Sequence, residues 1–289
     1  LTHEGSIREW LPYPYDWRKG AYDVVGDDLL RETYRLASTS KTGKVIIIAH
    51  SNGGLVAKAL MKKLEGQGKP DLIEKAIFIA VPELGTPQAI LAMLHGDNQS
   101  IAGGLVLSEK TSRFFSQNLP GAYGLIPTRR FFEKNPMTVV SDMFSGRQNQ
   151  SASSYESLKN FLTKGSFSKA STTDINIPLT LNSYLLSLND SFHSLMDSWK
   201  PASGTKTLSI FGWGVPTSKS VAYEKDAHCA PVSRNCNLSM FRTITSAGDG
   251  TVMTAASSGM SDQTLYLDIK KVKQDGRRDI KQEDIMESQ

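Results

Sequence analysis

Lys44-Val45-Ile46-Ile47-Ile48-Ala49-His50-Ser51-Asn52-Gly53-Gly54-Leu55-Val56 is the stretch that decides the fold of this 289-residue chain. Residues 45–49 form a short, continuous apolar run rich in isoleucine, which predicts a buried strand of a parallel sheet. Residues 50–54 predict a tight turn, and apolar residues at helical spacing then predict a helix ending near residues 66–70. A second apolar run follows at residues 76–81. This strand–turn–helix–strand order is the unit of a doubly wound parallel sheet.

The same patterns continue outward from this unit. Two more strands are predicted at residues 207–211 and 263–269, and a helix at residues 23–38. Between about residues 93 and 204 the strand pattern is lost, and helical pieces are expected at residues 108–117, 155–162 and 179–199, with a flexible joint at 148–154. We therefore predict an α/β fold with a mainly parallel sheet, whose core spans about residues 1–92 and 205–289, and a mostly helical cap inserted at about residues 93–204.

Ser51 lies in the predicted strand-to-helix turn, where a serine can act as a nucleophile. A serine hydroxyl needs a base to take its proton and an oxyanion hole to receive the developing charge. Such a turn presents the hydroxyl beside backbone N–H groups, and it is so tight that the residues two positions away must be small. Ala49 and Gly53 meet that need, and Gly54 lets the helix pack close to the strand. The backbone N–H of Asn52 is the expected oxyanion donor. The alternative is that Ser51 is a turn serine that caps the helix.

Asp249 is the candidate acid of a Ser–Asp–His triad, which in this type of enzyme follows the chain order serine, acid, histidine. An aspartate between Gly248 and Gly250 can be held by the backbone and aimed inward. The alternative is a simple Asp-Gly turn. No histidine follows Asp249, and we assign the base to none of the five that precede it: His3, His50, His95, His193 and His228. We expect His193 to be a satisfied surface or core histidine, and the base to lie beyond the given chain.

The composition bears on nucleic-acid binding, membrane insertion and metal binding. The 33 basic and 29 acidic residues are spread along the chain, so nucleic-acid binding has little support. No run of 18 apolar residues is present, so no transmembrane segment is predicted. Cys229 and Cys236 allow either a short-range disulfide or two thiols, and with His228 alone they make an incomplete metal site. A disulfide would fit an extracytoplasmic or cell-surface protein.

Several segments form an ordered series: Pro14-Tyr15-Asp16-Trp17-Arg18, His50-Ser51-Asn52-Gly53-Gly54, Val81-Pro82-Glu83-Leu84-Gly85-Thr86-Pro87, His95-Gly96-Asp97-Asn98, residues 118–127, Gly212-Trp213-Gly214-Val215-Pro216-Thr217 and Gly248-Asp249-Gly250-Thr251-Val252. In this order, residues 10–255 resemble the lecithin:cholesterol acyltransferase-like branch of the α/β-hydrolases, in its bacterial type. The resemblance implies Ser51 as nucleophile, Asp249 as triad acid, and acyl transfer or hydrolysis on lipid esters without a cofactor or metal.

Two departures from the family pattern bear on the site. The family's histidine comes a few dozen residues after its acid, and an early His-Gly oxyanion loop precedes the segment that Tyr15 to Arg18 resembles. Neither is present in this sequence. His3-Glu4-Gly5 lies too close to that segment to be the oxyanion loop. Asn52 also stands where the family usually has Met. We expect the chain to be a fragment of a longer protein that is inactive by itself.

Three functions stay open on the sequence alone. The first is an acyl-ester hydrolase or O-acyltransferase on lipid-like esters, with possible contact to a membrane surface. Cap residues Phe114-Phe115, Leu125-Ile126 and Phe131-Phe132 would then line an acyl pocket, although they could equally pack the cap on the core. The second is a peptidase or thioesterase, since the same triad serves all these bonds. The third is a non-catalytic binding module.

Overall fold

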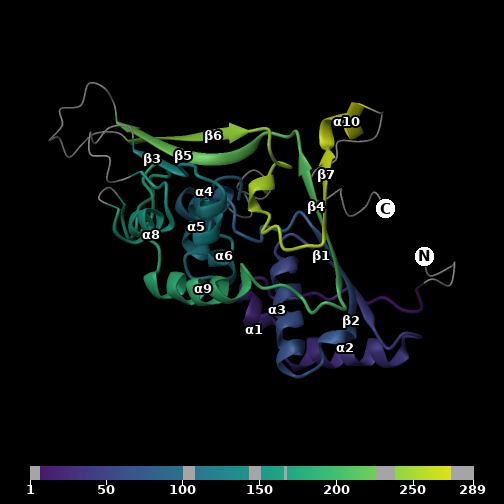
Figure 1. The fold of residues 1–289 in the computed structure, drawn as a ribbon. Coiled ribbons are helices and arrows are strands. Elements are labelled where there is room, and N and C mark those ends of the chain that lie inside the picture. Colours follow the sequence, from purple (N-terminus) through teal and green to yellow (C-terminus); the bar gives the residue numbers. More distant parts are fainter. Residues whose placement is uncertain (1–6, 100–107, 143–150, 166–167, 226–237, 275–289) are drawn as a thin grey trace.

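Four parallel strands form the main sheet of the protein, in the order β1–β2–β4–β7 (Figure 1). The computed structural model describes residues 7–99, 108–142, 151–165, 168–225 and 238–274. The strands are β1 (Val45–His50), β2 (Ile73–Ile79), β4 (Lys206–Trp213) and β7 (Gln263–Asp268). Because every neighbouring pair is parallel, all four carboxyl ends meet at one edge of the sheet. The predicted strands and the α/β fold class are confirmed.

One face of the sheet is covered by α3 (Gly53–Gly66), the helix that follows Ser51. Ala49 of β1 and Phe78 of β2 pack into one apolar cluster with Leu55 and Leu60 of α3. On the other face, Ile46 and Ile48 of β1 are about half exposed. The sequence predicted a buried strand, but among the described residues β1 is an edge strand whose outward side chains are uncovered.

The first helical region is split in two. The sequence predicts one helix over residues 23–38, whereas the structure has α1 (Ala21–Val24) and α2 (Asp27–Thr39). Gly26 separates them in an extended conformation, with φ −90° and ψ −173°. A glycine loses more conformational entropy in a helix than other residues do, so a break at this position is favoured.

The segment predicted as the insertion, residues 93–204, is mostly helical, with α5 (Glu109–Ser116), α6 (Pro120–Tyr123), α7 (Arg129–Lys134), α8 (Tyr155–Lys164) and α9 (Ser183–Met196). The helix α4 (Pro87–His95) begins before that predicted boundary and packs with these helices. Short helical turns elsewhere are η1 (Pro70–Leu72), η4 (Thr254–Ala256) and α10 (Ile269–Gln274). Phe131, Tyr155 and Leu186 lie in the apolar core that these cap helices share.

A second sheet, which the sequence did not predict, lies over α4 and α5 (Figure 1). It contains β3 (Val140–Asp142), β5 (Thr217–Lys225) and β6 (Leu238–Thr245), with β5 and β6 antiparallel. Val221 and Tyr223 of β5 belong to the apolar core of the cap. The division at residues 92 and 205 stays a prediction, and the structure adds that β5 packs with the cap helices.

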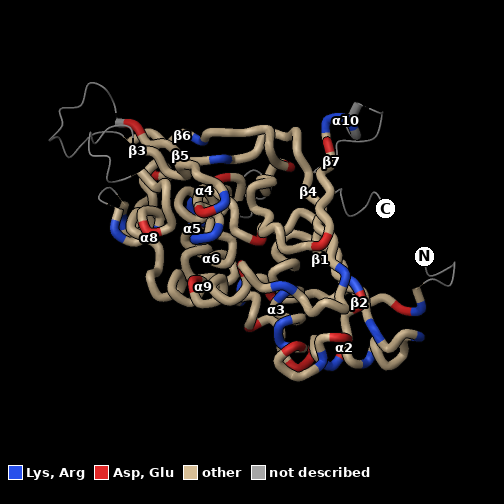
Figure 2. The backbone as a smooth tube through the Cα atoms, viewed as in Figure 1, with Lys and Arg blue, Asp and Glu red and all other residues tan. Residues whose placement is uncertain are grey.

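Several features of the sequence lie wholly or partly outside the described residues: the segment His3-Glu4-Gly5, the pair Cys229 and Cys236, His228, and residues 148–150 of the predicted joint. None of the helices in the described ranges is long and apolar enough to cross a membrane. Figure 2 shows basic and acidic residues interspersed along the described chain.

His95, at the end of α4, is a buried neutral histidine that joins two parts of the cap. Its Nδ1 lies 2.5 Å from the carbonyl oxygen of Ile175, so Nδ1 donates, and its Nε2 accepts from the Tyr223 hydroxyl at 2.7 Å. Burial lowers the pKa of His95 to about 4 from an ordinary value of 6.5. Charging this ring in the folded protein is therefore unfavourable.

Acid is expected to destabilise the protein through His95. The unfolded chain binds a proton at this ring below about pH 6.5, and the folded chain binds it only near pH 4. The free energy of unfolding should therefore fall by roughly 3 kcal/mol between these two pH values. Urea unfolding across this range measures the effect. The variant His95→Gln, which cannot titrate, should show a flatter slope, and equal slopes for both proteins would contradict the assignment.

Candidate active site

Ser51 adopts a left-handed backbone conformation, with φ +50°, between β1 and α3. This region is uncommon for residues other than glycine and costs about 1–3 kcal/mol, so it persists only where the surroundings impose it. Here the Ser51 N–H donates to the carbonyl oxygen of Ile79 at 2.9 Å, and the Ser51 carbonyl accepts from Gly54 N–H at 3.0 Å. The predicted turn is therefore a strained strand-to-helix elbow that presents the serine at the carboxyl edge of the sheet.

Gly54 allows α3 to lie close to Val81, which follows the end of β2. A Cβ atom on Gly54 would lie 2.2 Å from a methyl carbon of Val81, much closer than carbon atoms can approach. Gly53 has more space, since the nearest atom to its Cβ position is the Tyr15 hydroxyl at 3.7 Å. The sequence predicted that Gly54 lets the helix pack close to the strand, and the structure gives Gly54 a close contact at Val81, after the end of β2.

Gly54→Ala is expected to destabilise the protein by about 2–3 kcal/mol, because the added methyl group overlaps Val81 in a packed core. Gly66, in the last turn of the same helix, has no atom within 4 Å of its Cβ position. Gly66→Ala should instead stabilise the protein by about 0.5–1 kcal/mol. Thermal unfolding of both variants measures the difference, and similar shifts for both would refute the packing argument.

Tyr15 brings the N-terminal segment against the elbow, a contact that the sequence pattern does not predict. Burial raises the pKa of Tyr15, and a hydrogen bond with the Asn52 side chain partly offsets this effect. The same segment also touches the cap, since Gly121 N–H donates to Arg18 O at 2.9 Å. A Cβ atom on Gly121 would lie 2.0 Å from Trp17 O. The segment is thus held between the elbow and α6.

Asp249 is buried and held by the backbone, as predicted. Its Oδ1 accepts from the N–H groups of Thr251 at 2.9 Å and Val252 at 2.8 Å. Its Oδ2 is buried and has no hydrogen-bond partner among the described residues. Burial raises the pKa of Asp249, and these backbone bonds partly offset the rise. A buried carboxylate oxygen without a donor is costly, so Oδ2 is suited to a partner such as an imidazole N–H.

The sheet brings Ser51 and Asp249 to the same edge. Ser51 follows the end of β1, and Ala80, which follows β2, donates its N–H to Ile210 O of β4 at 2.8 Å. A Cβ atom on Gly212 of β4 would lie 3.0 Å from the Asp249 Cβ. The two residues therefore sit about two strand spacings apart, roughly 10 Å.

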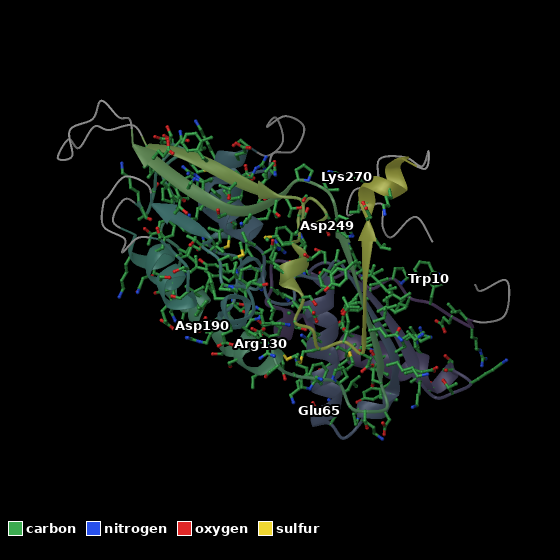
Figure 3. The ribbon with its side chains drawn as sticks, turned by 45° about the horizontal axis from the view of Figure 1, so that its top comes forward. Trp10, Glu65, Arg130, Asp190, Asp249 and Lys270 are labelled. Carbon is green, nitrogen blue, oxygen red and sulfur yellow. The ribbon has the colours of Figure 1, made fainter. Side chains whose placement is uncertain are left out.

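The last described strand ends at this edge as well. Trp213 of β4 pairs with Asp268 of β7, and α10 begins with Ile269 directly after it. Ile269 is buried against Gly212. Figure 3 shows Lys270 and Asp249 at the same end of the sheet. The chain that leaves β7 therefore starts beside Asp249.

None of the three described histidines bonds to Ser51 or Asp249. Both ring nitrogens of His95 are occupied within the cap. The Nδ1 of His193 lies 2.6 Å from Asp197 Oδ1 and its Nε2 lies 3.0 Å from Gly124 O, so both ring nitrogens have partners and His193 is a satisfied core histidine, as predicted. The Nε2 atom of His50 is buried without a partner, and burial lowers the pKa of this ring. His3 and His228 lie outside the described residues.

The aromatic pairs of the cap differ in their burial. Phe131, Phe132 and Ile126 are buried in the cap core, which favours the packing alternative for them, whereas Phe115 is exposed. A cavity of about 340 Å³ lies beside α7, α8 and α9, with Arg130, Tyr155 and His193 in its wall. Neither Ser51 nor Asp249 lines it.

Comparison with known proteins adds a family and a fold. Residues 7–267 match the family model described as lecithin:cholesterol acyltransferase. A search of curated proteins found no match. Among solved structures, a chain in "The crystal structure of Tle4-Tli4 complex" is similar in fold, with 16% sequence identity and a TM-score of 0.54. The alignment covers 86% of this chain and 60% of that chain, so the present chain spans less than two thirds of the structure it resembles.

Proposed function

Because this chain belongs to the lecithin:cholesterol acyltransferase family, we propose that it provides the nucleophile and acid of a serine-dependent acyl-ester hydrolase or O-acyltransferase. The observation that carries the proposal is the left-handed elbow at Ser51, at the same sheet edge as Asp249 with its unpaired Oδ2. The proposed substrate class is lipid-like esters, from the family. Because lipid substrates and the pair Cys229 and Cys236 fit such a setting, we also propose an extracytoplasmic or cell-surface location.

In the proposed reaction, Ser51 Oγ attacks the ester carbonyl carbon while a base takes its proton. The carbonyl oxygen becomes negative, and the proposed donor to it is the N–H of Asn52. Its position at the N-terminus of α3, the positive end of the helix, supports this role. The bond from carbon to the leaving alcohol then breaks, and the base returns the proton to that alcohol. Water or a second alcohol finally takes the acyl group from Ser51.

We place the base, a histidine, beyond Gln289 in the chain. Two observations support this position. The described histidines are engaged elsewhere or make no bond to the candidate pair. The chain also leaves β7 beside Asp249, so a later residue can reach Oδ2. An imidazole there would donate from one nitrogen to Asp249 and accept the Ser51 proton on the other.

A substrate panel on the full-length protein tests this function. Esters of short and long acyl chains, a thioester and an amide should be compared, with Ser51→Ala as the blank. We expect long-chain esters to be cleaved best. Preference for the thioester or the amide would favour a thioesterase or peptidase instead. A folded protein that cleaves none of them would favour the non-catalytic binding module.

A further inference from the structure

A buried ion pair connects the nucleophile helix with the loop that follows β2. Lys58 of α3 is 3% exposed and Glu83 is 2% exposed. The Lys58 Nζ donates to the Glu83 Oε1 at 3.4 Å. Charged side chains are almost never fully buried unless they are paired, because removing each charge from water is costly. This pair is fully buried about two helical turns after Ser51, so we asked which other contacts its charged groups make.

The second oxygen of Glu83 binds the segment that carries the candidate acid. Oε2 accepts from the Ser258 N–H at 2.9 Å and from the Ser258 hydroxyl at 2.8 Å. Ser258 is fully buried. One carboxylate thus bridges α3 and residues 249–258. Hydrogen bonds to a charged acceptor are among the stronger ones in proteins.

Two more bonds tie the same loop to the same segment. The Leu84 N–H donates to Ala256 O at 2.9 Å, and the Thr86 hydroxyl donates to Thr251 O at 3.0 Å. Thr251 in turn supplies one of the two N–H groups that hold Asp249 Oδ1. The placement of the Asp249 carboxylate therefore depends on how residues 251–258 lie against residues 83–86.

We propose that Glu83 is a positioning residue for the reaction at Ser51. Its carboxylate fixes residues 249–258 against α3, so that Asp249 and Ser51 are presented to the same base. This inference rests on the proposed function, because it concerns the same triad. Catalysis is sensitive to such a link, since a displacement of about 1 Å can cost about a hundredfold in rate.

Two double variants separate positioning from a merely structural ion pair. Both Lys58→Met/Glu83→Gln and Lys58→Met/Glu83→Leu remove the ion pair at similar side-chain volume. The glutamine keeps an oxygen that can accept from Ser258, and the leucine does not. In the full-length protein we expect kcat to stay within about threefold of wild type for the glutamine variant. For the leucine variant we expect a fall of about 10- to 100-fold, with KM little changed.

The measurement is kcat and KM per active site, with the sites counted by a fluorophosphonate probe and folding followed by thermal unfolding. Should the leucine variant fail to fold, Ser258→Ala removes the hydroxyl bond to Glu83, together with the bond that this hydroxyl accepts from Met260 N–H at 3.2 Å, and should lower kcat by about three- to tenfold. Equal kcat values for the two double variants, or for Ser258→Ala and wild type, would overturn the positioning role and leave the proposed function intact. A folded wild-type protein that the probe does not label would overturn the proposed function and this inference with it.

Discussion

Replacing Ser51 by alanine is expected to lower kcat of the full-length protein about a million-fold. The rate that remains is the one that substrate binding and the oxyanion hole provide without a nucleophile. The hydroxyl supplies the atom that bonds to the acyl carbon, and alanine offers none. At φ +50° alanine carries the same backbone strain as serine, so the two proteins differ only in the hydroxyl group. Hydrolysis of a long-chain ester, measured per folded molecule, gives the effect.

Ser51→Gly is the matched comparison for this variant. It should be equally inactive, but it should raise the free energy of unfolding by about 1 kcal/mol relative to Ser51→Ala, since glycine adopts a left-handed φ without strain. Thermal or urea unfolding of the two variants measures the difference. Ester hydrolysis that survives in either variant would show that another residue is the nucleophile.

Asp249→Asn is expected to lower kcat by about ten-thousand-fold without unfolding the protein. An amide can still accept the backbone bonds of Thr251 and Val252 on its oxygen. It cannot stabilise a positively charged imidazole, and it favours the wrong tautomer of the base. In the 289-residue chain, where no described histidine bonds to Asp249, burial raises the pKa of this carboxyl, so its ionised form opposes folding at neutral pH. In that chain the variant should therefore unfold at the same temperature as wild type or a higher one.

An exposed aspartate provides the control for this variant. Asp71 of η1 is exposed to solvent. Asp71→Asn should leave both kcat and thermal stability close to wild type. Asp249→Asn activity close to that of Asp71→Asn would assign the acid elsewhere and make the Asp-Gly turn the better interpretation of this motif.

The elbow was predictable because every sequence feature that specifies it lies within a few consecutive residues. A run of β-branched apolar residues specifies the strand, small residues allow the tight turn, and helical spacing from Leu55 onward specifies the helix. What the pattern could not foresee was the exposed outer face of β1, where Ile46 and Ile48 are uncovered. Burial of that face depends on which elements lie beside the strand, and local sequence does not contain this information.

The hairpin of β5 and β6 was missed because part of its buried side is polar. Ser218 and Ser220 are buried, and their hydroxyls bond to Gln88 and Thr243. Hydropathy patterns treat serine as a surface or turn residue. Only the partners, which come from distant parts of the chain, make these hydroxyls suitable for a packed interior.

Lys58 and Glu83 were missed for a related reason, although a signal was present. Lys58 interrupts an otherwise apolar stretch of α3, Leu55-Val56-Ala57-Lys58-Ala59-Leu60, and all six residues are buried. A lysine within such a stretch implies a buried carboxylate partner. Finding which carboxylate requires the tertiary structure, because Glu83 lies 25 residues away.

The most direct test of the account is the site of covalent modification by a fluorophosphonate. The full-length protein should be treated with the probe, digested, and analysed by mass spectrometry for the modified peptide. We predict one adduct, on Ser51, that fails to form in Asp249→Asn on the same timescale. A folded protein that stays unmodified, or an adduct on another residue, would contradict the claim that this elbow holds an activated serine.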